Sequence, residues 1–141
     1  MKKTYKGSCH CGAVHFEADV DLASPSQRCN CTYCRKTRYW KSFVGTDDIR
    51  LLSGEADLAD YRAPDSQWPE DHIHHRFCRH CGVQLFSKGY LDMAPFNGWF
   101  YALNLASLDN VDEADLAAVP IIYENGIADR QDQPPVHSTY L

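Results

Sequence analysis

The chain contains 141 residues, of which 44% are hydrophobic and 12% aromatic, and its formal net charge is -5. This length fits one domain, and the apolar fraction supports a hydrophobic core and excludes intrinsic disorder. The acidic balance argues against a nucleic-acid-binding protein, which normally carries a basic patch. No run of about 18 apolar residues is present, and no apolar signal segment follows the Lys-rich start. We therefore expect a cytoplasmic protein that binds neither nucleic acid nor membranes.

Short segments with period-two alternation lie between turn signals along most of the chain, which is typical of a mainly β domain. In the segment 13–18, Val14 and Phe16 fall on one face and His15 and Glu17 on the other, as in a half-buried strand. Further strands are predicted, in chain order, over 41–46, 49–53, 58–62, 72–77, 83–88 and 99–105. The last of these is the most apolar and is expected to be central.

Only one short helix is predicted after these strands. Asn110 and Glu113 have the spacing of a helix cap, so at most one short helix is expected here, ending before Pro120. Segments 120–124 and 127–129 flank an Asn-Gly pair that favours a hairpin turn. The tail from about residue 130 is polar, contains two adjacent prolines and is expected to be irregular.

The seven cysteines occur in three closely spaced groups, C-x-C, C-x-C-x-x-C and C-x-x-C. They are Cys9 and Cys11, then Cys29, Cys31 and Cys34, then Cys78 and Cys81. Disulfides are rare in a reducing compartment, so closely spaced cysteines there are more often metal ligands or catalytic groups. An odd number of cysteines would also leave one thiol unpaired in a disulfide framework.

The first and last groups resemble each other, because each ends in Cys-Gly and leads into an alternating strand. Glycine at this point allows the tight turn that directs backbone N-H groups toward the thiolate sulfurs. Four thiolates in a tetrahedron around Zn²⁺ form a closed structural site. We predict that Cys9, Cys11, Cys78 and Cys81 hold such a zinc, and that its removal destabilises the whole domain.

The middle group differs because Cys29, Cys31 and Cys34 provide three thiolates within six residues, with no glycine immediately after them. Catalytic zinc sites commonly have three protein ligands and keep a fourth position for water or substrate. The spacing therefore favours a catalytic role for these three cysteines.

Two other interpretations of the middle group remain open. A distant histidine would complete a four-ligand structural site, and the candidates are His72, His74, His75 and His137. Alternatively, the cysteines hold no tightly bound metal and serve redox chemistry. His10 and His80 lie between ligands of the same metal, where the tight geometry makes them poor ligands.

Three cysteine groups in this order and context resemble the glutathione-dependent formaldehyde-activating enzyme family, which includes centromere protein V. The resemblance rests on Gly7-Ser8-Cys9-His10-Cys11-Gly12-Ala13-Val14, Cys29-Asn30-Cys31, Cys34-Arg35, Phe77-Cys78, Cys81-Gly82 and Ala102-Leu103-Asn104. It implies one zinc-binding domain over residues 1–141, folded as a zinc-stapled β-tent of small antiparallel sheets. It also implies two zinc ions per chain, one structural and one catalytic, held by the cysteine sets given above.

The family's namesake reaction joins formaldehyde to glutathione and gives S-hydroxymethylglutathione. The resemblance therefore implies a carbon-sulfur lyase that acts on a small thiol or thiol-aldehyde adduct, with Cys29, Cys31 and Cys34 at its catalytic centre. A thiol bound to zinc loses its proton readily, which suits this chemistry. The alternative is a non-catalytic zinc-stapled module that binds another protein through the loops 63–71 or 90–97.

A basic and aromatic segment, Arg35-Lys36-Thr37-Arg38-Tyr39-Trp40, stands where many family members have small residues. In one interpretation the three cations attract an anionic thiol such as glutathione, while Tyr39 or Trp40 forms a wall of the pocket. In the other, the cations are solvated at a strand edge and the aromatic rings belong to the core.

Overall fold

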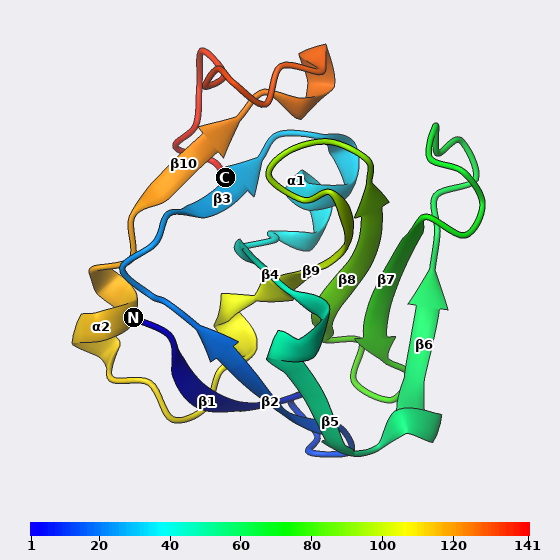
Figure 1. Ribbon diagram of the computed structural model, residues 1–141, viewed down its shortest axis with the longest axis vertical. Helices are drawn as coiled ribbons and strands as arrows, with labels where there is room; N and C mark the ends of the chain where they lie inside the picture. The colour runs from blue at the N-terminus through cyan, green and yellow to red at the C-terminus, as the bar shows by residue number, and fades with distance from the viewer.

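The computed structural model describes residues 1–141, and its strands form two sheets (Figure 1). The smaller sheet has the order β1-β2-β5, formed by Lys3–Ser8, His15–Val20 and Ile49–Ser53. The larger sheet has seven strands in the order β10-β3-β4-β9-β8-β7-β6. In chain order these are β3 (Ser26–Cys29), β4 (Lys41–Val44), β6 (Leu58–Tyr61), β7 (Ile73–Cys78), β8 (Gln84–Leu91), β9 (Gly98–Asn104) and β10 (Ile121–Glu124).

The helices are short. The two α-helices are α1 (Thr32–Thr37) and α2 (Glu113–Ala117). Single 3₁₀ turns occur at η1 (Thr46–Asp48), η2 (Glu55–Asp57), η3 (Leu105–Ser107) and η4 (Gly126–Ala128). None of the helices has the length and apolar character needed to cross a membrane.

The main hydrophobic core lies between the two sheets. Phe16 of β2 is completely buried, and its ring meets that of Phe86 in β8 edge-on at a centroid distance of 6.5 Å. Leu85 and Leu103 of the larger sheet are completely buried in the same cluster. Because each such side chain contributes about 2 to 3 kcal/mol on burial, this cluster holds the small sheet against the large one.

The expectation of a mainly β fold is confirmed, and each strand predicted up to residue 105 has a counterpart. The apolar strand β9 is central, because it pairs antiparallel with β4 on one side and with β8 on the other. Leu103 and Ala102 on this strand are buried, which explains its unbroken apolar run.

Four details of the prediction are wrong or incomplete. At most one short helix was expected, but the structure also has the helix α1. Strands β1 and β3 were not predicted. The hairpin after residue 124 does not form, because 126–128 is the 3₁₀ turn η4, with only an isolated bridge between Asn125 and Arg130. Strand β10 instead pairs in parallel with β3, so the larger sheet is mixed and is neither small nor wholly antiparallel.

Candidate metal centres

The first cluster of thiols joins the two sheets. Cys9 and Cys11 lie between β1 and β2, whereas Cys78 and Cys81 lie at the turn between β7 and β8. Their four sulfurs all lie within 4.8 Å of one another. The Sγ atoms of Cys9 and Cys11, and those of Cys11 and Cys78, are each 3.7 Å apart. All four cysteines are free of disulfides. A tetrahedron with Zn–S bonds of about 2.3 Å has S–S edges of about 3.8 Å, so this set of four sulfurs fits zinc.

The two turns that carry these thiols have the same backbone geometry. Gly12 and Gly82 have φ of 78° and 77°, in the left-handed region that favours glycine. Within the turns the backbone N-H of Val14 donates to Cys9 Sγ at 3.3 Å, and that of His80 donates to Cys78 Sγ at 3.4 Å. Such bonds stabilise the thiolate form that a metal requires.

The second cluster is formed where β3 passes into α1. Cys29 ends β3, Cys31 is the N-cap of α1, and Cys34 lies within the helix, with the three sulfurs within 4.8 Å of one another. Backbone N-H groups of Cys31 and Cys34 donate to the sulfurs of Cys29 and Cys31, each at 3.4 Å. Hydrogen bonds from Cys31 and Cys34 lower the pKa of the Cys29 thiol, whereas hydrogen bonds with Cys29 and Cys31 raise that of Cys34. The three thiols therefore do not lose their protons together without a compensating cation such as a divalent metal.

None of the four candidate histidines belongs to this cluster. His74 Nδ1 is 2.6 Å from an Asp60 carboxylate oxygen, and His72 packs against the Tyr90 ring at a centroid distance of 4.7 Å. His75 Nδ1 is 2.6 Å from Ser87 Oγ, and His137 is exposed in the C-terminal segment. The donor set of the middle group remains three thiols, which fits a zinc site with one position open to a further ligand.

The C-terminal segment covers the three-thiol cluster, and β10 lies beside β3 in Figure 1. The Asn30 side chain donates to Asn125 Oδ1 at 2.9 Å and accepts from the Ile127 backbone N-H at 3.1 Å. Gly126 lies against the sulfur of Cys29, so that a Cβ at residue 126 would overlap that sulfur. The sequence pattern predicted a hairpin turn at this glycine, whereas in the structure a glycine is required because residue 126 packs closely against the thiol.

A buried ion pair lies beside the same cluster. Lys41 Nζ of β4 is 3.0 Å from a carboxylate oxygen of Glu124 at the end of β10 and 3.9 Å from Cys34 Sγ. Burial lowers the pKa of Lys41, but the negative charges of Cys34 and Glu124 outweigh it and raise the pKa above its ordinary value. The ammonium therefore stays charged and offsets thiolate charge. Neither residue was predicted from the sequence, because they lie on strands far apart in the chain.

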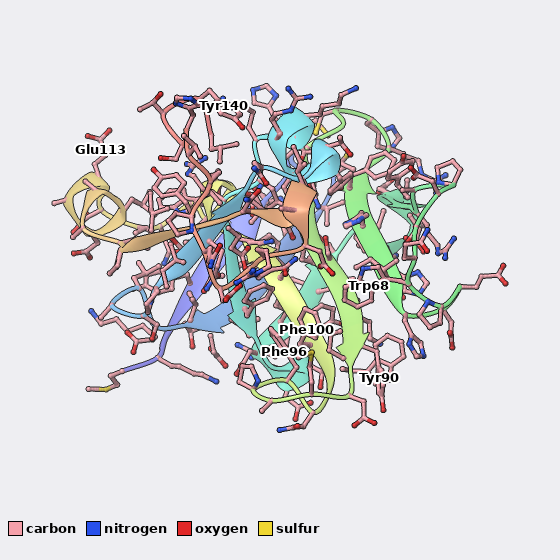
Figure 2. All side chains as sticks on the ribbon, turned by 90° about the horizontal axis from the view of Figure 1, so that it is seen from above. Trp68, Tyr90, Phe96, Phe100, Glu113 and Tyr140 are labelled. Atoms are coloured by element: carbon pink, nitrogen blue, oxygen red, sulfur yellow. The ribbon has the colours of Figure 1, made fainter.

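A cavity of about 790 Å³ lies next to this ion pair. Tyr39, Lys41 and Glu124 line the end near the cluster, and aromatic side chains line much of the remainder. Figure 2 shows Trp68, Tyr90, Phe96 and Phe100, which all line this cavity, grouped in one part of the molecule. The volume is in the range of small-molecule sites.

A polar network borders the cavity between the ion pair and the aromatic rings. Ser87 Oγ is 3.1 Å from the hydroxyl of Tyr39, which also donates to the carbonyl of Ala102, and 2.6 Å from His75 Nδ1. The His75 ring stacks on Tyr33 of α1 at a centroid distance of 3.8 Å. Burial lowers the pKa of His75 to about 4, so its imidazole is neutral at physiological pH.

The basic segment after the cluster does not reach the cavity. Arg35, Lys36 and Arg38 are exposed, and Arg38 donates to the carbonyl of Tyr140 in the C-terminal tail. Tyr39 does line the cavity, as one interpretation expected, whereas Trp40 donates to Ser26 Oγ at 2.7 Å. The three cations are thus exposed, as the other interpretation expected, but they lie on α1 and at its C-cap and not at a strand edge.

Known proteins resemble this chain in sequence and in fold. The family model described as glutathione-dependent formaldehyde-activating enzyme matches residues 4–125. A Halomonas elongata protein assigned by name to these enzymes is 33% identical over 85 residues, which cover 57% of this chain and 54% of that protein. The chain thus matches about half the length of this curated relative. A crystal structure of a Rhodobacter sphaeroides protein is similar with a TM-score of 0.62 and 30% identity, over 83% of this chain and 99% of that one. Because the family model covers most of the sequence, the chain belongs to the glutathione-dependent formaldehyde-activating enzyme family.

Proposed function

We propose that this protein is a zinc-dependent carbon-sulfur lyase that acts on a small thiol-aldehyde adduct such as S-hydroxymethylglutathione. The observation that carries the proposal is the cluster of Cys29, Cys31 and Cys34, whose three thiols have no histidine or carboxylate partner. The cysteines do not themselves line the cavity of about 790 Å³, but Lys41, which lines it, lies 3.9 Å from Cys34 Sγ. Membership of the family supports the reaction class.

In this proposal the seven cysteines hold two zinc ions. Cys9, Cys11, Cys78 and Cys81 close a structural site, and Cys29, Cys31 and Cys34 hold the catalytic ion. Zinc bound there supplies a positive charge that lowers the pKa of a fourth, substrate-derived sulfur ligand. The Lys41 ammonium, 3.9 Å from Cys34 Sγ, offsets the negative charge of the protein thiolates.

The reaction needs one proton transfer and no oxidant or reductant. In the direction of breakdown, the hydroxyl proton of the adduct leaves, the C=O bond forms, and the C–S bond breaks with its electron pair kept by sulfur. We assign the acceptance of that proton to the Glu124 carboxylate, which lines the cavity and is held by Lys41 at 3.0 Å. His75 and Tyr39, joined through Ser87, supply neutral polar groups along the same wall.

The shape of the site favours this proposal over a protein-binding module. The two loops that such a module would display contribute Trp68 and Phe96 to the lining of the same cavity, so they enclose a volume suited to a small molecule. We accordingly propose a small thiol as the partner, with glutathione as the family's example. The free thiols agree with a cytoplasmic, reducing environment.

Zinc analysis combined with turnover measurements tests the proposal. Protein prepared without added metal should contain two zinc ions per chain, and Cys31→Ser should lose one of them together with all turnover while the chain stays folded. Cys81→Ser is the matched variant in the structural cluster and should unfold the domain. One zinc per chain in the unmodified protein, or full turnover by Cys31→Ser, would contradict the assignment.

A further inference from the structure

The cavity has two chemically different ends. Lys41 and Glu124 lie at the end near the three-thiol cluster. Aromatic rings extend from this pair toward the other end: Lys41 Nζ is 5.5 Å from the centroid of the Phe43 ring. The rings of Phe43, Phe96 and Phe100 pack on one another, with centroid distances of 5.0 Å for Phe43 and Phe96, 5.6 Å for Phe43 and Phe100, and 4.3 Å for Phe96 and Phe100. A ligand that reaches from one end to the other therefore places its reacting atoms near the thiols and its remaining part among aromatic rings.

Two loops extend this aromatic end. Trp68 lines it from the segment between β6 and β7, and its carbonyl accepts a hydrogen bond from the Arg62 guanidinium. Met93 lines it from the loop between β8 and β9. Arg62 is thus engaged by the backbone of the loop and is not among the residues that line the cavity.

The charges in the cavity do not suit a ligand with free carboxylates. Lys41 is the only lysine or arginine in the lining, and it is already paired with Glu124. Asp92 and Asp129 add two further carboxylates without a cation beside them in the lining. Lys88 follows the lining residue Ser87 on β8 but does not line the cavity, and its Nζ lies 4.9 Å from the centroid of the Trp99 ring. Recognition of a carboxylate normally requires an arginine or a lysine, and acidic neighbours repel it.

Glutathione has two carboxylates and one ammonium, whereas the lining offers one neutralised cation, further carboxylates and aromatic rings. We propose that the thiol accepted by this site carries an uncharged aromatic arm, which packs among Phe43, Phe96 and Phe100, and that the tripeptide is a poor ligand. This inference rests on the proposed function for the reaction, and it replaces glutathione, the family's example of the thiol, with an aromatic thiol. The reaction is unchanged: the C–S bond to the aldehyde carbon forms or breaks, and one proton moves.

Binding to the zinc-loaded protein is the test, with phenylmethanethiol as the aromatic probe and glutathione as the charged one. Isothermal titration should give an affinity for phenylmethanethiol at least about tenfold higher than for glutathione, because several aromatic contacts are worth about 1.4 kcal/mol or more. Phe96→Ala should lower the affinity for phenylmethanethiol about tenfold and leave glutathione unchanged. Leu52→Ala, which removes a half-exposed apolar side chain outside the cavity, is the matched control and should change neither affinity.

A charge variant gives a second readout that does not depend on the integrity of the aromatic cluster. Met93 is 59% exposed at the cavity rim, so Met93→Lys adds a cation there with little strain and should raise the affinity for glutathione several-fold.

Equal or tighter binding of glutathione by the unmodified protein would overturn the inference and leave the lyase assignment intact. Tighter binding of phenylmethanethiol without turnover of any adduct would support the aromatic preference and contradict the lyase assignment. Failure of the protein to bind either thiol would overturn both.

Discussion

Gly126 lies directly against the sulfur of Cys29, and there is no space for a Cβ between them. The same absent side chain would approach Cys31 Cβ to 3.0 Å, so two of the three clustered cysteines are packed against one glycine. The hydrogen bonds of Asn30 to Asn125 and Ile127 hold this contact in place. The segment after β10 is therefore a structural part of the three-thiol cluster.

Gly126→Ala should displace Cys29 and weaken metal binding at the three-thiol cluster, because the added methyl group overlaps the sulfur. We expect the purified variant to contain about one zinc per chain instead of two, with circular dichroism that still shows the folded β structure. Ala128→Ser changes an exposed residue of the same 3₁₀ turn and should retain both ions. Two zinc ions in Gly126→Ala would show that the contact does not control the geometry of the cluster.

Cys81→Ser should destabilise the entire domain, because the four-thiol cluster joins the turns of two different sheets. The free energy of metal binding is folding free energy in such a site, so we expect the variant to lose its folded structure, seen by circular dichroism as the absence of a cooperative unfolding transition. A chelator should reproduce this loss in the unmodified protein. If Cys81→Ser and Cys31→Ser were equally stable, the distinction between a structural and a catalytic cluster would be wrong.

Lys41→Met should destabilise the fold by roughly 3 kcal/mol, because it leaves the Glu124 carboxylate buried beside thiolates without its cation. The double variant Lys41→Met/Glu124→Gln should recover part of that loss, since it removes both buried charges. Urea unfolding with zinc content measured in parallel separates this effect from loss of metal. A double variant less stable than the sum of the single changes would contradict the pairing.

His75 should make stability depend on pH in the acidic range. Its pKa is about 4 in the folded chain against 6.5 for an ordinary histidine, mainly because it is buried. Between these values the unfolded chain binds a proton that the folded chain does not, so stability falls as the pH is lowered from about 6.5 toward about 4. The difference between the two pKa values corresponds to roughly 3 kcal/mol once the pH is below 4, of which roughly 2 kcal/mol is lost between pH 7 and pH 5.

Thermal or urea unfolding at pH 7 and pH 5 measures this contribution. His75→Gln lacks the titrating imidazole and should lose less stability than the unmodified protein over the same interval. Zinc release in acid affects both proteins alike, so the difference between them isolates His75. Identical losses would mean that His75 is accessible to solvent in the folded chain.

The thiol clusters could be predicted from sequence because their determinants are local. A Cys-Gly turn imposes its own backbone geometry, as the left-handed φ values of Gly12 and Gly82 show. Two turns of the same kind then indicated one shared cluster, although residues 11 and 78 are far apart in the chain. Three thiols within six residues likewise need only the short helix α1 to converge.

The surroundings of the clusters could not be predicted because they depend on strand order. Strand β3, Ser-Gln-Arg-Cys, lacks apolar alternation, and it forms because β10 and β4 pair with its two edges. The contact between Lys41 and Glu124 depends on that same order, and nothing near either residue in the sequence indicates it. Gly126 follows Asn125, and an Asn-Gly pair is typical of a hairpin turn, so the sequence did not indicate that this glycine packs against Cys29.

Strand β10 is the last strand to be synthesised, yet it lies beside β3, where the three-thiol cluster begins. During translation the sulfurs of Cys29, Cys31 and Cys34 thus emerge long before Gly126 and the Asn125 side chain that enclose them. The four-thiol cluster, by contrast, has every donor once residue 81 has left the ribosome. We expect the nascent chain to acquire its structural ion first and to keep the other cluster open to solvent thiols and metals until the final segment docks.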